Sequence, residues 1–280
     1  MNLSVTGLTY TYPGGVTALR DVSLRIATGD TLAIVGQNGA GKTSLVKHFN
    51  GLLRPSAGTV TVGEWDTRSR SVAKLAASVG YVFQNPDDQL FQPTVEKEVA
   101  FGPRNLGWAA PRVIASTRAA LELAGLTAQA QRHPYDLGPS DRKRVALAAV
   151  LAMETPVVVL DEPTTGQDYA GVELVGRIVL RLREQGRTVI TVTHDIDFCA
   201  EYFQRVIVMG QGRVLFDAPA REALSQTSVL AQTDVEPPQL MRLAARLPWP
   251  PKTPLPLTVD EFITGWMGAA TAPAGPSALQ

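Results

Sequence analysis

Four short, almost entirely apolar runs are spaced along the chain, and segments with a helical period separate them. The runs are TLAIV (31–35), GYVF (80–83), VVVL (157–160) and TVITVT (188–193). A continuous apolar run of this length is typical of a strand buried on both faces, as in a parallel sheet covered by helices. The hydrophobic pattern therefore predicts a wound α/β core.

The segments around this core have other periods. Near the N-terminus, LSVTGLTYTYPGG and ALRDVSLRIATGD alternate apolar and polar residues and break at Gly and Pro, which predicts antiparallel strands beside the main sheet. Between about residues 85 and 155 the period becomes helical, most clearly over 112–125, where Gly125 supplies a stop signal. We expect a helical subdomain over about 85–155.

The composition of the chain changes near residue 234, where Pro clusters alternate with short amphipathic segments. One of these segments begins with a capping box formed by Thr258 and Glu261. This change predicts one large domain over 1–233 and a C-terminal extension over 234–280. We expect the extension to be helical to about residue 267 and to end in a mobile tail, GAATAPAGPSALQ.

Composition and charge narrow the classes of function. The 280 residues are 45% hydrophobic and carry 26 basic and 26 acidic side chains, so no net positive field favours nucleic acid as the main partner. Cys199 is the single cysteine, which excludes an internal disulfide and fits a reducing, cytoplasmic compartment. The longest apolar run, 145–153, is too short to span a bilayer, so any membrane role is expected to be peripheral.

A glycine-rich loop follows the first apolar run and precedes a helical segment. Its sequence, GQNGAGKTS, fits the pattern G-x-x-x-x-G-K-[ST], in which backbone N–H groups curl around phosphates at the start of a helix. Lys42 is expected to reach the terminal phosphates and the Thr43 hydroxyl to ligate Mg²⁺. The loop therefore predicts an ATP and magnesium site formed by Gly36, Gln37, Asn38, Gly39, Ala40, Gly41, Lys42, Thr43 and Ser44.

Two acidic residues, Asp161 and Glu162, come directly after the run VVVL. Ligands collect at the carboxyl ends of strands in open α/β sheets, so both side chains are expected beside the phosphates. Asp161 is placed to hold Mg²⁺ through water, and Glu162 to orient or deprotonate the attacking water. An acidic pair at a strand end can also cap the following helix, but together with the glycine-rich loop it predicts nucleotide hydrolysis.

At this point the chain resembles an ABC-type ATPase, the nucleotide-binding subunit of a transporter. The resemblance implies a P-loop NTPase fold of the ABC-ATPase type, with an antiparallel β subdomain and a helical subdomain. It also implies that Tyr12 stacks on adenine and that Asp168 is the D-loop aspartate. Gln84 would be the Q-loop glutamine, acting in catalysis and on Mg²⁺, and His194 the catalytic switch histidine.

Two further stretches resemble the ATPase subunits of energy-coupling-factor (ECF) transporters, which import vitamins and transition-metal ions. They are FQNPDDQLFQPTVEKEVAFGPRNLG (83–107) and the extension, with EPPQLMRLAARLP and PLTVDEF. The resemblance implies a second ATPase subunit, a membrane-embedded coupling component and a substrate-binding component. It places the chain at the cytoplasmic face of the cell membrane. Within the group, the cobalt or nickel importers are most similar, and a vitamin importer is the alternative.

The segment that the family uses to contact ATP across its dimer interface departs from the Leu-Ser-Gly-Gly-Gln pattern. Aligned on Leu137, Gly138 replaces the serine, Pro139 and Ser140 replace the two glycines, and Asp141 replaces the glutamine. Pro139 has no N–H, so one possible donor is lost. A homodimer in which Ser140 and the remaining N–H groups still contact ATP is favoured narrowly. The alternatives are an asymmetric heterodimer and a segment in which Ser140 or Asp141 only caps the helix.

Two other classes of function remain as alternatives to a transporter motor. A soluble ABC ATPase that acts on DNA or ribosomes typically carries two ATPase halves or a long coiled-coil insertion, and no such insertion separates Lys42 from Leu137. A nucleotide-gated scaffold that binds ATP without turning it over is suggested only by the altered segment. We therefore expect a transport-coupled ATPase.

Overall fold

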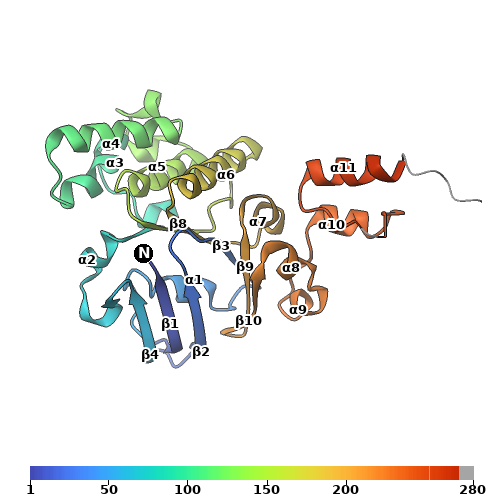
Figure 1. The fold of residues 1–280 in the computed structure, drawn as a ribbon. Coiled ribbons are helices and arrows are strands. Elements are labelled where there is room, and N and C mark those ends of the chain that lie inside the picture. The colour runs from blue at the N-terminus through green and yellow to red at the C-terminus, as the bar shows by residue number, and fades with distance from the viewer. Residues whose placement is uncertain (252, 271–280) are drawn as a thin grey trace, which may run out of the picture.

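The computed structural model describes residues 1–251 and 253–270 (Figure 1). Its central feature is a six-stranded sheet with the order β10-β9-β3-β8-β7-β6, in which every neighbouring pair is parallel except β10 with β9. The four apolar runs form four of its strands, so the predicted wound α/β core is confirmed. The strands are β3 (Thr31–Val35), β6 (Val79–Val82), β7 (Val157–Asp161), β8 (Thr188–Val192), β9 (Arg205–Gly210) and β10 (Arg213–Pro219).

A second, antiparallel sheet is built mainly from the N-terminal segments, as their alternating pattern predicted. Its order is β2-β1-β4-β5. One face of this sheet packs with the central sheet around a single hydrophobic cluster that also includes Leu45 and Phe49. The short helix that follows the glycine-rich loop is thus held between the two sheets. The strands are β1 (Leu3–Thr11), β2 (Thr17–Ile26), β4 (Ala57–Val62) and β5 (Trp65–Asp66).

Helices cover the other face of the central sheet and form a layer that is separate from the antiparallel sheet (Figure 1). The expected helix over 112–125 is α4, which ends before Gly125 at a left-handed φ of 65°. It packs with α3 and α5, and the bounds of about 85–155 for a helical subdomain stay a prediction. The helices of residues 1–233 are α1 (Lys42–Val46), α2 (Val72–Ala76), α3 (Val95–Asn105), α4 (Ala110–Leu123), α5 (Pro139–Leu151), α6 (Tyr169–Glu184), α7 (Ile196–Tyr202), α8 (Ala220–Ser225) and α9 (Thr227–Ala231).

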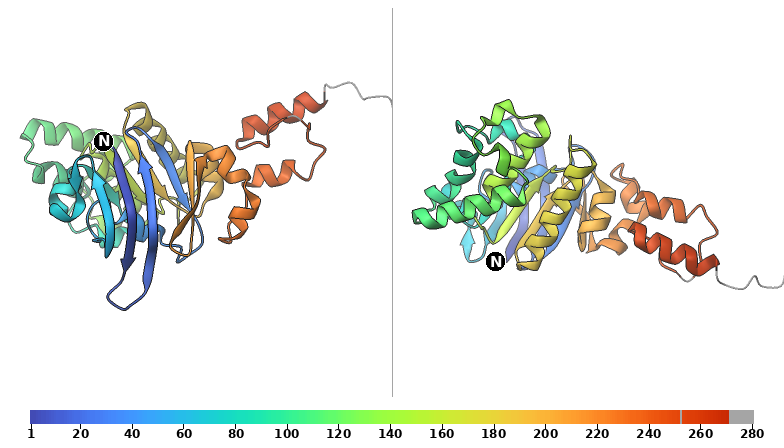
Figure 2. Two further views of the ribbon diagram at one scale, coloured as in Figure 1. Left: turned by 60° about the horizontal axis from the view of Figure 1, so that its bottom comes forward. Right: turned by 90° about the horizontal axis from the view of Figure 1, so that it is seen from above.

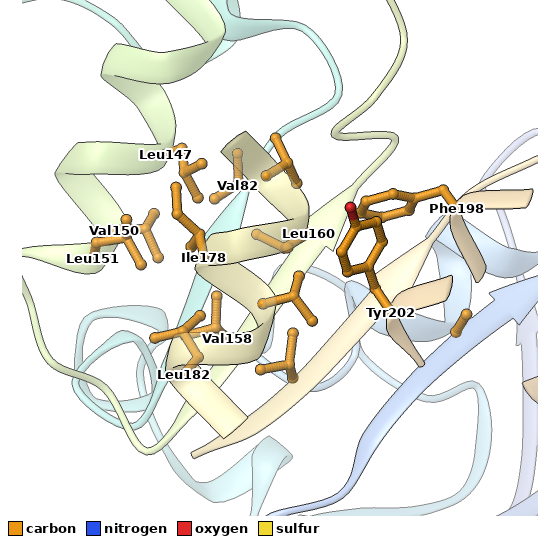
Figure 3. Close-up of a cluster of buried hydrophobic side chains, with 14 of the residues drawn as sticks. Val82, Leu147, Val150, Leu151, Val158, Leu160, Ile178, Leu182, Phe198 and Tyr202 are labelled. Atoms are coloured by element: carbon orange, nitrogen blue, oxygen red, sulfur yellow. The ribbon is translucent and has the colours of Figure 1, made fainter. Parts of the chain in front are cut away.

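The alternation of side chains along β7 explains why the strand is apolar throughout. Val157 and Val159 belong to the cluster shared with the antiparallel sheet, whereas Val158 and Leu160 belong to the cluster beneath the helices. Figure 3 shows this second cluster, in which side chains from α5, α6 and α7 meet the sheet. Apolar side chains therefore cover both faces of the central sheet, and the polar groups lie at the ends of its strands.

The C-terminal extension projects from the end of the sheet that carries β10 (Figure 2). It contains α10 (Gln239–Ala244) and α11 (Val259–Ala270). Met241 of α10 is buried in the cluster beneath the helices, and Arg221 of α8 pairs with Glu261 of α11 at 2.6 Å. The extension is thus anchored to the domain, and the boundary at 233/234 stays a prediction.

The capping box predicted at the start of α11 is present. Thr258 Oγ1 accepts the N–H of Glu261, and the Glu261 carboxylate accepts hydrogen bonds from the backbone N–H groups of Leu257 and Thr258. The same carboxylate pairs with Arg221 of α8. Helix α11 continues to Ala270, so the tail expected from residue 268 is wrong for residues 268–270, and the rest of that expectation, over 271–280, lies outside the described residues.

Candidate nucleotide-hydrolysis site

The glycine-rich loop connects β3 to α1, as its sequence predicted. Gly36 has a φ of 147°, and a Cβ at this position would lie 2.1 Å from the carbonyl oxygen of Met209. Gly41 has a φ of 97°, and a Cβ there would lie 2.6 Å from the carbonyl oxygen of Ala18. Only glycine combines this conformation with this close approach of neighbouring backbone. The loop is thereby held on β9 and β2.

Lys42 lies under the loop and is only 7% exposed. Its Nζ donates hydrogen bonds to the carbonyl oxygens of Gly36 and Gln37, the latter at 3.0 Å. Burial lowers the pKa of Lys42, while the negative charges of Glu162 and Asp161 act in the opposite direction. The ammonium is therefore held within the glycine-rich loop.

Asp161 ends β7 and is buried. Its Oδ1 accepts a hydrogen bond from Thr43 Oγ1 at 3.1 Å, and its Oδ2 accepts one from the Tyr81 hydroxyl at 2.6 Å. Burial, and secondly the charge of Asp161, raise the pKa of Tyr81, so the phenol remains a donor. The carboxylate and the Thr43 hydroxyl, both oxygen ligands of the kind that Mg²⁺ prefers, thus lie side by side.

Glu162 adopts a left-handed conformation, with a φ of 50°. Its N–H donates to the carbonyl oxygen of Val192 at 2.8 Å. Its carboxylate lies 2.9 Å from His194 Nδ1 and 3.4 Å from Thr165 Oγ1. A non-glycine residue in this region is strained by about 1–3 kcal/mol, and such strain is concentrated at functional sites. The backbone turn directs the carboxylate from the strand end toward His194.

Two adjoining cavities open at this edge of the sheet. The first, of about 390 Å³, is lined by Tyr12, by residues 38–44 and by both Gln84 and Glu162. Tyr12 lies at its rim, 37% exposed, and its hydroxyl is 2.9 Å from Ser44 Oγ. The second, of about 620 Å³, is lined by residues 36–38, Gln84, Glu162, His194 and the start of the C-terminal extension. The glycine-rich loop, Tyr12, Gln84, Glu162 and His194 therefore share one continuous surface.

Residues 137–141, the altered signature segment, lead into α5 and line neither of these cavities. Gly138 is the N-cap and Pro139 occupies the first turn, where a backbone N–H has no partner within the helix. Ser140 Oγ donates to Gln167 Oε1 at 2.8 Å, and Asp141 pairs with Arg144. The interpretation that Ser140 or Asp141 caps the helix is wrong, because both side chains have these other partners.

Asp168 also lies apart from the two cavities. Its Oδ1 accepts the N–H of Gly171 at 2.8 Å and so caps α6. Within one chain, the structure thus brings together the loop, Tyr12, Gln84, the acidic pair and His194. It leaves Gly138, Ser140 and Asp168 on a separate surface. The contacts that the family resemblance implies for these three residues require a second subunit.

Three residues that sequence reasoning missed also contribute to the site. Tyr81 holds Asp161, and Thr233 Oγ1 accepts the N–H of Gln37 at 2.9 Å while donating to the carbonyl oxygen of Met209 at 2.8 Å. Lys143 donates to the backbone carbonyl oxygens of Glu162 and Thr165. Only Tyr81 had a weak signal in the sequence, because its hydroxyl lies in an otherwise apolar run that predicts a buried strand. Thr233 and Lys143 had no such signal.

Comparison with known proteins identifies the family. The model of the ABC transporter family matches residues 19–165. An "Energy-coupling factor transporter ATP-binding protein EcfA" from Methanoculleus marisnigri is 42% identical over 246 residues, covering 88% of this chain and 89% of that protein. A "Putative ABC transporter ATP-binding protein" from Methanosarcina acetivorans is 40% identical, covering 86% of this chain but only 39% of its own, greater length.

Solved structures agree with this assignment. The structure of cbiO1 from Clostridium perfringens, described as part of the ABC transporter complex cbiONQ, superposes with a TM-score of 0.73 at 34% identity. The superposition covers 88% of this chain and 95% of that one. No helix among residues 1–251 and 253–270 is long and apolar enough to cross a membrane. This chain belongs to the ABC transporter family, as an ATP-hydrolysing cassette of the energy-coupling-factor type.

Proposed function

We propose that this chain is the motor subunit of an ECF-type importer and that it couples ATP hydrolysis to uptake of cobalt or nickel. One observation supports the ATPase activity: the glycine-rich loop, Asp161 and the Glu162–His194 pair lie together at one edge of the sheet. The similarity to cbiO1 supports a metal ion as the solute. An importer of a vitamin is the alternative, because the relatives named EcfA carry no solute in their names.

In the proposed chemistry, water attacks the γ-phosphorus, and the bond from that phosphorus to the bridging oxygen breaks to give ADP and phosphate. The Glu162 carboxylate orients this water or accepts its proton, and His194 holds the carboxylate through the 2.9 Å contact. Lys42 offsets the charge of the terminal phosphates. Tyr12, which lines the cavity beside the loop, would stack on adenine.

The residues around Asp161 fit a bound Mg²⁺. Thr43 and Asp161 would hold it, directly or through water, and Gln84, at the junction of both cavities, would complete the oxygen ligands. When bound, Mg²⁺ supplies positive charge that neutralises the β- and γ-phosphates. The fit rests on the adjacent hydroxyl and carboxylate oxygens of Thr43 and Asp161.

We further propose that two copies of this chain face each other and that α5 of each contacts the ATP of the other. With the Ser140 hydroxyl engaged by Gln167, the donors left for a phosphate are the backbone N–H groups of Ser140 and Asp141 at the helix N-terminus. Asp168 would face the partner beside them. A heterodimer with an intact signature on the other subunit is the alternative, and nucleic acid is not a partner in either case.

The remaining proposed partners are a membrane-embedded coupling component and a substrate-binding component, which would hold the chain at the cytoplasmic face of the cell membrane. The test is to purify the membrane complex through a tag on this chain and to reconstitute it in liposomes. ATP-dependent uptake of radioactive cobalt or nickel is expected. Uptake of a vitamin alone would favour the alternative solute, and purification without any membrane companion would refute the transporter function.

The chemistry is tested separately with Glu162→Gln, which keeps the size of the side chain but cannot accept a proton. Turnover should fall by about a hundredfold or more while ATP still binds, in line with the contribution of a general base. Glu184→Gln is the matched control, because Glu184 is exposed at the end of α6. Undiminished phosphate release by Glu162→Gln would show that Glu162 has another role.

The subunit count is tested by native mass spectrometry of the same complex. Two copies of this chain would support the homodimer, in which the altered segment faces ATP in both sites. One copy beside a different ATPase would refute the homodimer and support an asymmetric pair.

A further inference from the structure

Lys143, a half-buried residue of α5, points back into its own subunit. Lys143 Nζ donates hydrogen bonds to the carbonyl oxygen of Glu162 at 3.0 Å and to that of Thr165 at 2.6 Å. Burial lowers the pKa of Lys143, and the charges of Glu162 and Asp161 counteract this effect. The ammonium therefore binds the loop that begins at the proposed catalytic carboxylate.

Because of this contact, the peptide groups on both sides of the Glu162 Cα are held by hydrogen bonds. The Glu162 N–H is bound by the carbonyl oxygen of Val192 on β8, and the Glu162 C=O is bound by Lys143 on α5. Between these two hydrogen bonds the chain adopts the left-handed φ of 50°. A residue persists in such a conformation only where its surroundings hold it there, and here they are a strand on one side and α5 on the other.

A second contact joins the same helix to the far end of the same loop. Ser140 Oγ, one turn before Lys143, donates to Gln167 Oε1 at 2.8 Å. Helix α5 thus holds the loop 162–167 near its start through Lys143 and at its end through Ser140. The loop does not pack on α5 by apolar contact alone, so its position depends on these directed hydrogen bonds.

We propose that Lys143 is a positioning residue for hydrolysis and that it acts through the backbone of Glu162 in the same subunit. The proposal rests on the proposed role of Glu162. The ammonium holds the left-handed turn that directs the carboxylate toward His194, and it does not touch the nucleotide. A displacement of α5 relative to the central sheet is thereby passed directly to the catalytic carboxylate.

The test compares Lys143→Met, which keeps the aliphatic stem, with Lys143→Arg, which keeps a cation and several donors. Lys74→Met is the matched control, because Lys74 is exposed on α2. Turnover against ATP concentration is measured in the membrane complex purified through a tag on this chain. Binding of a non-hydrolysable ATP analogue with Mg²⁺ is measured for the full-length chain by calorimetry.

Lys143→Met is expected to lower kcat roughly tenfold, the effect of losing about 1.4 kcal/mol of transition-state stabilisation. The KM for ATP and the affinity for the analogue should stay within about twofold, because the phosphate loop is untouched. Lys143→Arg should recover most of the turnover. This split between kcat and KM, with rescue by arginine, is not expected of a residue that only stabilises the fold.

Three results would overturn the proposal. Unchanged turnover in Lys143→Met, with turnover lost in Glu162→Gln, would leave the function standing and exclude a role for Lys143. A second such result is a rise in the KM for ATP that matches the loss of turnover, which would indicate general damage to α5. Where Lys143→Met fails to fold, a tenfold loss of kcat in Lys143→Arg takes the place of this result, because it contradicts the expected rescue. Undiminished turnover in Glu162→Gln would remove the proposed role of Glu162, and this inference with it.

Discussion

The hydrogen bond between Tyr81 and Asp161 offers a test in which a single atom is removed. Tyr81→Phe deletes the hydroxyl that donates to Asp161 Oδ2 at 2.6 Å and leaves the ring in place. The ring is 6% exposed and packs edge-on against Phe83, at 4.9 Å between centroids. Because phenylalanine fills the same volume, the substitution creates almost no cavity and isolates the hydrogen bond.

The magnitude follows from the charge and burial of the acceptor. A hydrogen bond to a charged group contributes about 1.5–3 kcal/mol, and removing one partner leaves a buried oxygen without a donor. Asp161 is 2% exposed, so water does not easily replace the phenol, but Oδ1 keeps its hydrogen bond from Thr43. We therefore expect a loss of about 2 kcal/mol, which lowers the melting temperature by roughly 5 °C in a domain of this size.

The assay is urea denaturation of the full-length protein without nucleotide, followed by a titration of Mg²⁺ in the ATPase reaction. The concentration of Mg²⁺ at half-maximal turnover should rise, because the carboxylate is no longer oriented toward Thr43. Tyr135→Phe is the matched control. Its hydroxyl donates at 3.2 Å to the neutral carbonyl oxygen of Leu90 and the residue is 47% exposed, so a loss below about 0.5 kcal/mol is expected.

A loss of stability in Tyr81→Phe no larger than in Tyr135→Phe would refute this reasoning. It would mean that the Asp161 carboxylate is solvated equally well without the phenol. Normal stability combined with an unchanged requirement for Mg²⁺ would further show that Tyr81 does not orient Asp161.

The other predictions concern the loop, the extension and acid stability. Thr233→Val removes the hydroxyl that joins the N–H of Gln37 to β9, so unfolding in urea should show a loss of about 2 kcal/mol that Thr233→Ser largely avoids. Arg221→Met should speed hydrogen exchange over residues 255–262 and leave the stability of the domain within about 1 kcal/mol, since this ion pair is partly exposed. His48 is buried against the carbonyl oxygen of Ser44, and burial lowers its pKa, so its stabilising effect is fully present above about pH 6.5 and is lost as the pH falls toward its folded pKa. Stability measured between pH 5 and 7 should therefore fall less steeply in His48→Leu, and equal slopes would contradict this account.

Much of the fold and of the nucleotide site follows from the sequence alone, because the signals are local. Continuous apolar runs identified four of the six strands of the central sheet, and GQNGAGKTS placed the glycine-rich loop between a strand and a helix. Asp161 and Glu162 were placed beside that loop by a rule of sheet topology, since the carboxyl ends of parallel strands lie at one edge. These inferences need only neighbouring residues and a known architecture.

The tertiary structure alone decided which side chains support these groups. Tyr81 meets Asp161 across 80 positions, and Thr233 meets the phosphate loop across 196. The same holds for Ser140, whose hydroxyl turns to Gln167 and neither caps α5 nor remains free. Periodicity and motif spacing specify the face on which a side chain lies. The partner that a hydroxyl or an ammonium finds there depends on distant segments packed against that face, and no local pattern encodes them.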